Sequence, residues 1–425
     1  MTFRRPFRRP FFSLLLLVVP AAGALALLAA PASPASAAKR ASPAKPSSPA
    51  SPPAPVAPPA VAAMAADLGP TATTGPIAAK SYSKLAFGPG GILFLGDSIG
   101  ARIYALDLDD RKPVDTVGRL EIRDLETTVA AMLGADARDV LIHDLAVNPI
   151  SKNAYLTVSR GKRGFRSQWQ LPNDVAAPGV LLRVTPAGEI QEVRLDNVRH
   201  AAIEVANPIN EAAEDEDHVS KLRVDAISDM SYADGKLFVA GLSNEEFSST
   251  MRVYPFPFAG PGSATSLEIY HGSHGRYESN SPIRAFLTLR MRGKPYLFAS
   301  YLCTPLVLFP LDELQDKRHV KGKTIAELGD GDYPLDMVAF KAKGTQYVMV
   351  VTSARGVLVI KADDLSQPRA AITRPVRGTA AVPGRYVWNP GILQVENYGD
   401  ERLLVLARNV FNGQVSLSTM PVYLE

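Results

Sequence analysis

The stretch from Lys84 to Leu108, KLAFGPGGILFLGDSIGARIYALDL, constrains the fold more than any other part of the chain. It contains three short apolar runs, LAF, ILFLG and IYALDL, which are separated by the turn GPGG and the polar loop DSIGAR. Runs of this length, rich in branched and aromatic residues and bounded by Gly, Pro, Asp or Ser, are typical of β-strands. The stretch therefore predicts three consecutive strands joined by short connections.

The same layout recurs downstream, and repeats of roughly 50 residues are typical of β-propellers. In this all-β fold each blade is a four-stranded antiparallel sheet, and the blades surround a central channel. We name the strands of a blade A to D from the channel outward. The repeats predict six blades, although two long inserts leave room for a seventh.

Each blade has recognisable strand candidates. In the order A to D they are 85–87, 92–95, 103–108 and 117–122 in blade one; 144–147, 154–158, 180–184 and 190–195 in blade two; 227–232, 236–241, 250–256 and 266–270 in blade three; 283–290, 295–300, 306–311 and 323–328 in blade four; 335–341, 347–352, 357–361 and 370–373 in blade five; and 392–396, 402–407 and 415–420 in blade six. Blade six lacks a fourth candidate. We expect residues 77–80 to supply it, because pairing the chain ends removes unpaired strand edges.

Three further segments interrupt the repeats. Residues 124–134 carry apolar side chains at helical spacing and end in glycine, which predicts a short helix between blades. Residues 159–179 and 196–223 are long polar inserts.

The N-terminal part predicts export. Four arginines within the first nine residues precede an apolar stretch and the small-residue site Ala35-Ser36-Ala37, the pattern of a secretory signal peptide over residues 1–37. The paired arginines also resemble a twin-arginine signal. Residues 38–73, rich in Pro, Ala and Ser, predict a disordered tether. We expect a propeller domain over residues 74–425, in the periplasm or secreted, with no lasting transmembrane span.

Charge and cysteine content exclude several classes of function. Residues 1–65 hold seven of the 46 Lys and Arg residues and no acid, so the remainder has 39 basic and 42 acidic residues. Such a balance does not indicate nucleic-acid binding. Cys303 is the only cysteine, which excludes an intrachain disulfide. We expect its thiol to be buried or half-buried and not to be catalytic.

Phrases such as LAFGPGGILFLGD and MSYADGKLFVAG resemble secreted bacterial β-propellers of the NHL, YVTN and six-bladed lactonase-like kind. The resemblance covers about residues 74–425. It implies the fold, and it implies no named enzyme family.

Strand alternation predicts which face binds a ligand. The B–C and D–A connections emerge on one face, which we call the loop-rich face, whereas the opposite turn face has tight turns such as GPGG and ADG. The loop-rich face carries His, Glu, Asp, Asn and Arg side chains, which favours it as the binding face. Its candidate ligand-binding residues are Asp144, Asp229, Arg284, Asp336, Asn244, Glu245, His271, His274, Glu278 and Arg355.

Four of these candidates share a position at the start of an A strand, namely Asp144, Asp229, Arg284 and Asp336. Because the A strands line the channel, we expect the four side chains to meet near its mouth. In one interpretation each bonds the backbone of a neighbouring blade. In the other, Asp144, Asp229 and Asp336 bind a hard cation such as calcium. His271 and His274, three residues apart in a glycine-rich loop, could also share a metal ion.

The leading functional hypothesis is an exported module that binds an unidentified protein or small molecule around the channel on the loop-rich face. The first alternative is a calcium-dependent hydrolase or lactonase with the ion at the channel mouth. The second is a periplasmic redox partner or quinone-linked oxidoreductase, which fold analogy alone suggests. No G-x-S-x-G motif is present, so a serine hydrolase has little support.

Overall fold

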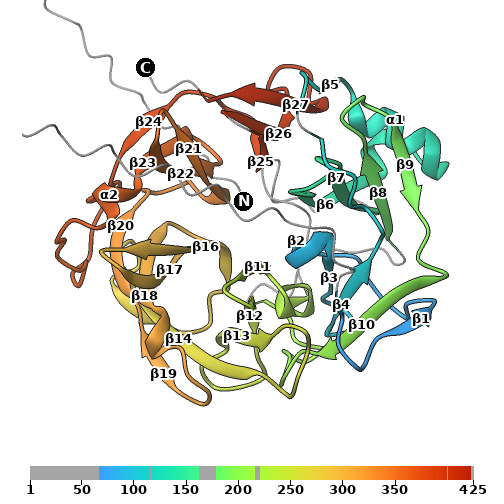
Figure 1. Cartoon of the computed structure of the whole chain (residues 1–425). Helices are drawn as coiled ribbons and strands as arrows, with labels where there is room; N and C mark the ends of the chain where they lie inside the picture. Colours follow the sequence, from blue (N-terminus) through green and yellow to red (C-terminus); the bar gives the residue numbers. More distant parts are fainter. Residues whose placement is uncertain (1–66, 115, 162–178, 216–220, 400, 423–425) are drawn as a thin grey trace, which may run out of the picture. The chain divides into compact units, whose positions relative to one another are not determined.

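The chain forms a β-propeller of six four-stranded blades around a channel, as the repeats predicted (Figure 1). The structure is a computed structural model that describes residues 67–114, 116–161, 179–215, 221–399 and 401–422. The predicted signal peptide and most of the tether lie outside these residues, as does most of the insert 159–179. In the part that is described, no helix combines the length and apolarity needed to cross a membrane.

The strands that build the blades are bounded as follows. Blade one contains β2 (Leu85–Phe87), β3 (Leu93–Asp97), β4 (Arg102–Asp107) and β10 (Val198–Glu204), with β1 (Thr73–Gly75) outside; blade two contains β6 (Val140–Val147), β7 (Ala154–Arg160), β8 (Val180–Val184) and β9 (Ile190–Val193); blade three contains β11 (Asp229–Ala233), β12 (Lys236–Leu242), β13 (Ser249–Pro255) and β14 (Ser263–His271), with β15 (Arg276–Glu278) and β19 (His319–Lys321) outside. Blade four contains β16 (Ile283–Met291), β17 (Lys294–Tyr301), β18 (Pro305–Pro310) and β20 (Lys323–Glu327); blade five contains β21 (Pro334–Ala342), β22 (Thr345–Thr352), β23 (Gly356–Lys361) and β24 (Arg385–Val387); blade six contains β25 (Ile392–Gly399), β26 (Arg402–Arg408), β27 (Val415–Pro421) and β5 (Glu121–Ile122).

Packing between blades explains why the middle strands are so apolar. Strand β7 is buried along AYLTVS, on both of its faces, because each blade is covered by a blade on either side. Strands buried on both faces have continuous apolar runs in place of alternation. The sequence signal for the B and C strands was therefore strong, and their predicted positions are confirmed to within a few residues.

The blades do not follow one another around the ring in chain order. The innermost strands are neighbours in the order β2, β6, β25, β21, β16, β11 and back to β2. Blade two therefore lies between blades one and six, and blade one lies between blades two and three, as the blue strands of Figure 1 show. The predicted closure by residues 77–80 would instead have placed blade six beside blade one.

Two strands cross between blades to produce this order, and both correct the predicted topology. Blade one takes its outer strand from β10, within the segment 196–223 that we had predicted to be an insert. Residues 117–122 do not complete blade one, because Glu121 and Ile122 pair with β27 of blade six. Residues 77–80, predicted to close the ring, form no strand. Strand β5, which lies between β4 and β6 in the chain, thus supplies the fourth strand of blade six in place of the predicted residues 77–80.

The linker from β4 to β5 is fastened by the buried carboxylate of Asp110. This carboxylate accepts hydrogen bonds from Asn148 Nδ2 (3.0 Å), Ser151 Oγ (2.7 Å), Asn153 Nδ2 (2.9 Å) and Tyr155 Oη (2.8 Å), all in or beside the A–B turn of blade two. One side chain therefore fixes the linker of blade one to blade two, where the chain crosses toward blade six.

Two smaller differences concern the other segments. Helix α1 (Leu125–Leu133) is confirmed, and it connects the outer strand of blade six to the A strand of blade two. The D strand of blade five is β24, and not the predicted residues 370–373. A second, four-residue helix, α2 (Ala362–Leu365), follows β23.

Candidate functional site

Three aspartates at the channel join neighbouring blades through backbone hydrogen bonds. Asp144 Oδ2 accepts the N–H of Leu85 at 2.7 Å, Asp229 Oδ2 accepts that of Phe286 at 2.9 Å, and Asp336 Oδ2 accepts that of Val395 at 2.7 Å. In each case the N–H belongs to the A strand of the next blade around the ring. This geometry is what the first interpretation of these residues required.

The aspartates stand in alternate blades, two, three and five, with blades one, four and six between them. The bonded residues Leu85, Phe286 and Val395 directly follow Lys84, Ala285 and Gln394, which therefore occupy the corresponding position in the intervening blades. Lys84 Nζ forms an ion pair with Asp144 Oδ1 at 3.3 Å, and Gln394 Nε2 donates to the same oxygen at 3.0 Å. We call Asp144, Asp229, Asp336 and Glu396, the last from β25, the channel acids.

The channel acids hold their protons more tightly than exposed carboxyl groups do. Burial, reinforced by repulsion from the other acids, raises the pKa of Asp229 to about 8 and that of Asp336 to about 7. The same causes raise the pKa of Glu396 well above its ordinary value. Burial also raises the pKa of Asp144, although Lys84 opposes the change. A cation bound in the channel would offset the cost of ionising these buried acids, so the channel favours a positively charged group near neutral pH.

Arg284 is close enough to interact with the aspartates but does not line the same cavity. Burial lowers the pKa of its guanidinium, and Asp225 is the first of four carboxyl groups that oppose this effect. Asp225, in the turn before β11, has a pKa raised by burial to about 6. Arg284 precedes Ala285 by one residue, which places it nearer the loop-rich face than the three aspartates.

A cavity of about 430 Å³ occupies the channel on the other side of the aspartates. Its walls include all four channel acids together with apolar and aromatic side chains such as Phe87, Met230 and Tyr232. Every lining residue belongs to an A strand or to the A–B turn of blade two. The cavity therefore extends toward the turn face, whereas we had expected the ligand to bind on the loop-rich face.

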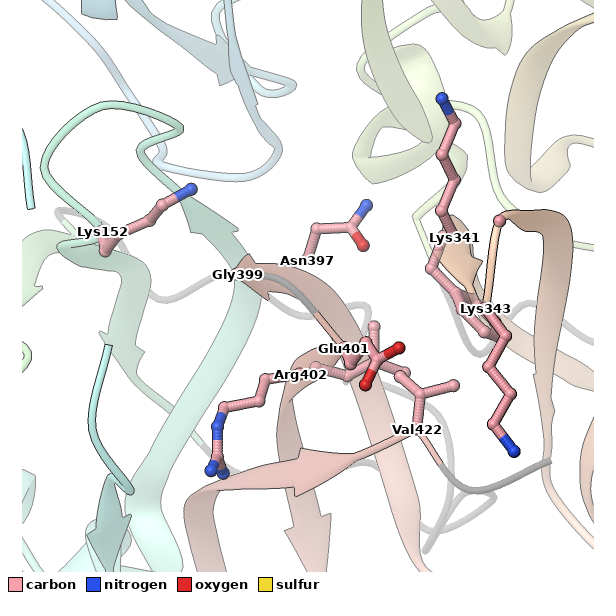
Figure 2. A pocket seen from close by; sticks show the side chains of 11 residues that line it. Lys152, Lys341, Lys343, Asn397, Gly399, Glu401, Arg402 and Val422 are labelled. Carbon is pink, nitrogen blue, oxygen red and sulfur yellow. The ribbon is translucent and has the colours of Figure 1, made fainter. Parts of the chain in front are cut away.

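A second hollow, of about 540 Å³, adjoins the channel between blades five and six (Figure 2). Lys152 and Asn397 line both spaces. The charged side chains around this hollow are basic except for Glu401, with Lys341, Lys343 and Arg402 contributed by β21, its turn and β26. An acidic channel thus has a basic groove beside it.

The aspartates do not form a compact metal cage. All six of their carboxylate oxygens already accept a hydrogen bond, and Asp144 Oδ1 also takes part in an ion pair. Calcium takes six to eight oxygens that converge on one point. Over the described ranges, a group of three or more potential ligands lying within 4.8 Å of one another occurs at His271, His274 and Cys303, and not at the channel acids. The calcium role of Asp144, Asp229 and Asp336 stays a prediction.

His271, His274 and Glu278, all predicted for the loop-rich face, meet at the outer side of blade three. Glu278 Oε2 lies 2.9 Å from His271 Nδ1, and Glu278 Oε1 lies 2.6 Å from His274 Nδ1. Burial alone would lower the pKa of His271, but bonds to Cys303 and Glu278 raise it to about 9. Burial would raise the pKa of Glu278, but the two histidines bring it to about 2.

The remaining predicted residues belong to neither group. Asn244 and Glu245 are exposed in the β12–β13 loop, where Glu245 accepts a hydrogen bond from Asn207 at 2.9 Å. Arg355 pairs with Asp332 at 3.6 Å and donates to the carbonyl oxygen of Leu328. The ten predicted residues are thus divided between the channel, the histidine cluster and isolated loop positions.

Sequence reasoning missed several residues of both groups. Lys84, Gln394 and Glu396 are polar residues at the A strands, and aligning blades one and six with the aspartate strands would have revealed them. Cys303 was predicted to be buried or half-buried, and it is half-buried, but its proximity to His271 depends on a contact between blades three and four. No local pattern signals such a contact.

No known protein-family profile and no curated protein matches the chain. Among solved structures, the pyrroloquinoline-quinone-bound aldose sugar dehydrogenase of Streptomyces coelicolor is 12% identical, with a TM-score of 0.30, and the match covers 85% of this chain and all of that one. A Thermus thermophilus protein described as a putative oxidoreductase (glucose dehydrogenase) is 11% identical, with a TM-score of 0.35, over 82% and 99% of the two chains. A chain of the mitotic checkpoint complex is 7% identical, with a TM-score of 0.30, over 87% and 98%. Likenesses this distant carry no information about a substrate.

Proposed function

We propose that this chain is an exported binding module that holds the cationic group of a small organic ligand in its central channel. The observation that carries the proposal is the cavity of about 430 Å³ whose walls include four carboxyl groups with raised pKa values. Its volume falls within the range of about 300–1,000 Å³ that is usual for small-molecule sites. We infer export from residues 1–37, which have the sequence pattern of a secretory signal peptide.

The chemistry of the channel favours an organic cation over a metal ion. An ammonium group donates up to three hydrogen bonds and can contact carboxylates that are several ångströms apart. A calcium ion would require those oxygens to converge, which the bonds from Phe286 and Val395 resist. Apolar walls around the acids suit an alkyl chain next to the ammonium group, and the basic groove would attract an anionic group at its far end.

Calorimetric titration of the full chain tests this proposal with three probes: hexylamine, 6-aminohexanoate and calcium chloride. We expect both amines to bind at pH 8, and 6-aminohexanoate to bind more tightly because its carboxylate reaches the basic groove. Asp336→Asn should weaken amine binding at least tenfold, because it removes a channel charge.

Glu245→Gln is the matched control, since it removes an exposed acid from the loop-rich face. Its affinity should equal that of the wild type. Calcium binding without amine binding would contradict the proposal and support the calcium alternative. Amine binding that Asp336→Asn leaves unchanged would place the ligand outside the channel.

A further inference from the structure

We infer that His271, His274 and Cys303 form a zinc site on the loop-rich side of the boundary between blades three and four. Two imidazoles and one thiolate are ligands that Zn²⁺ prefers, and three protein ligands leave a fourth tetrahedral position for water or a substrate. This site is separate from the channel acids, so it does not depend on the proposed amine ligand.

The backbone brings the two histidines together. His271 ends strand β14, and His274 lies three residues later in the turn that leads to β15. The N–H of Gly275 bonds to the carbonyl oxygen of His271 at 2.8 Å and closes this turn. As a result the centroids of the two imidazole rings are only 3.8 Å apart.

Glu278 orients both rings for metal binding. Its two oxygens accept from the Nδ1 atoms of His271 and His274, one oxygen for each ring. Arg276 Nε donates to Oε1 at 3.1 Å and helps to hold the carboxylate. A carboxylate on Nδ1 leaves Nε2 as the metal ligand, which is the usual arrangement around histidine-bound zinc.

Cys303 completes the set from the β17–β18 loop of blade four. The ligand atoms of the three residues lie within 4.8 Å of one another. Tetrahedral bonds of about 2.0–2.3 Å place ligands about 3.3–3.8 Å apart, so a small movement closes the site. The side chain of His274 is 46% exposed and can make this movement, whereas His271 is buried.

The surroundings suit a site that is rigid on one side and open on the other. Thr304 Oγ1 lies 3.2 Å from His271 Nε2, so zinc must replace this contact when it binds that nitrogen, and the Thr304 hydroxyl donates to Glu327, whose side chain is fully buried. Glu327 also accepts the N–H of Gly272 at 2.5 Å, which fastens the histidine turn to blade four. The fourth metal position would therefore face solvent beside His274.

Cobalt titration of the full chain, after dialysis against a chelator, tests the site without any assumption about activity. We expect one Co²⁺ per chain, with tetrahedral visible bands and a near-ultraviolet thiolate-to-cobalt band, and displacement by Zn²⁺. Cys303→Ser should abolish the thiolate band. His274→Ala should weaken zinc binding at least 100-fold, and Glu278→Gln about 10- to 100-fold.

His319→Ala is the matched control. His319 also contacts a carboxylate, that of Glu268 at 2.9 Å, and it lies outside the cluster. Its zinc affinity should match the wild type, and circular dichroism should show that every variant is folded. A folded wild type that binds no cobalt or zinc at 100 µM would overturn the inference. So would a Cys303 thiol that is alkylated equally fast with and without saturating zinc.

Discussion

Replacement of Asp110 by Ala is expected to lower the free energy of unfolding by about 3–5 kcal/mol. The substitution leaves the hydroxyl groups of Ser151 and Tyr155 and the side-chain amide of Asn153 without this acceptor, whereas Asn148 Nδ2 keeps its bond to the backbone carbonyl oxygen of residue 110 at 2.8 Å. Each buried donor that loses its partner lowers the free energy of unfolding by about 1–3 kcal/mol, unless a water molecule replaces the lost acceptor. Asp110 is only 8% exposed, so water has little access to replace the lost hydrogen bonds. Urea denaturation followed by circular dichroism measures the change.

Asp109→Asn is the control for this prediction. The carboxylate of Asp109 is 95% exposed and pairs with Arg111. Asparagine tolerates the left-handed backbone conformation of this position. We expect a change within about 0.5 kcal/mol. Equal stability of Asp110→Ala and Asp109→Asn would show that Asp110 does not fasten the crossing linker.

The stability of the ligand-free protein is expected to fall as pH rises from 5 to 9. The native state holds a proton on Asp229 up to a pKa of about 8, whereas the unfolded chain releases it near its ordinary value of about 4. Between these values the native state binds more protons, so increasing pH favours unfolding. Because the carboxyl group borders the cavity, we expect Asp229 to contribute about 2–4 kcal/mol of this loss.

Denaturation curves of the wild type and Asp229→Asn at several pH values isolate this contribution. Asparagine cannot titrate, and it has one acceptor oxygen for the N–H groups of Met230 and Phe286, where aspartate has two. The variant should therefore lose some stability at every pH but show a shallower slope. Parallel slopes would mean that Asp229 has an ordinary pKa in the folded protein.

Much of the fold could be predicted because blade strands are encoded locally. Apolar runs between turn residues located the B and C strands of every blade. The exchange between blades could not be predicted, since nothing in the sequences of β5, with two residues, and β10, with seven, ties either strand to one blade. Their positions depend on tertiary contacts such as those of Asp110, which join residues about 40 positions apart.

The channel site was predictable in part for the same reason. Asp144, Asp229 and Asp336 interrupt apolar runs at a repeated position, which indicated a shared location. The direction in which the cavity extends was not predictable, because side-chain volumes along the A strands decide it. The contact between Cys303 and His271 likewise depends on how blades three and four pack.

The most direct test of the account is the pH dependence of hexylamine affinity. The amine stays protonated between pH 6 and 8, whereas Asp229 and Asp336, with pKa values of about 8 and 7, must release protons to bind it. We expect wild-type affinity to rise about 10- to 50-fold over this range, with protons released to the buffer, and Asp229→Asn to flatten the rise. An affinity that is independent of pH, or identical in the variant, would contradict binding at the channel acids.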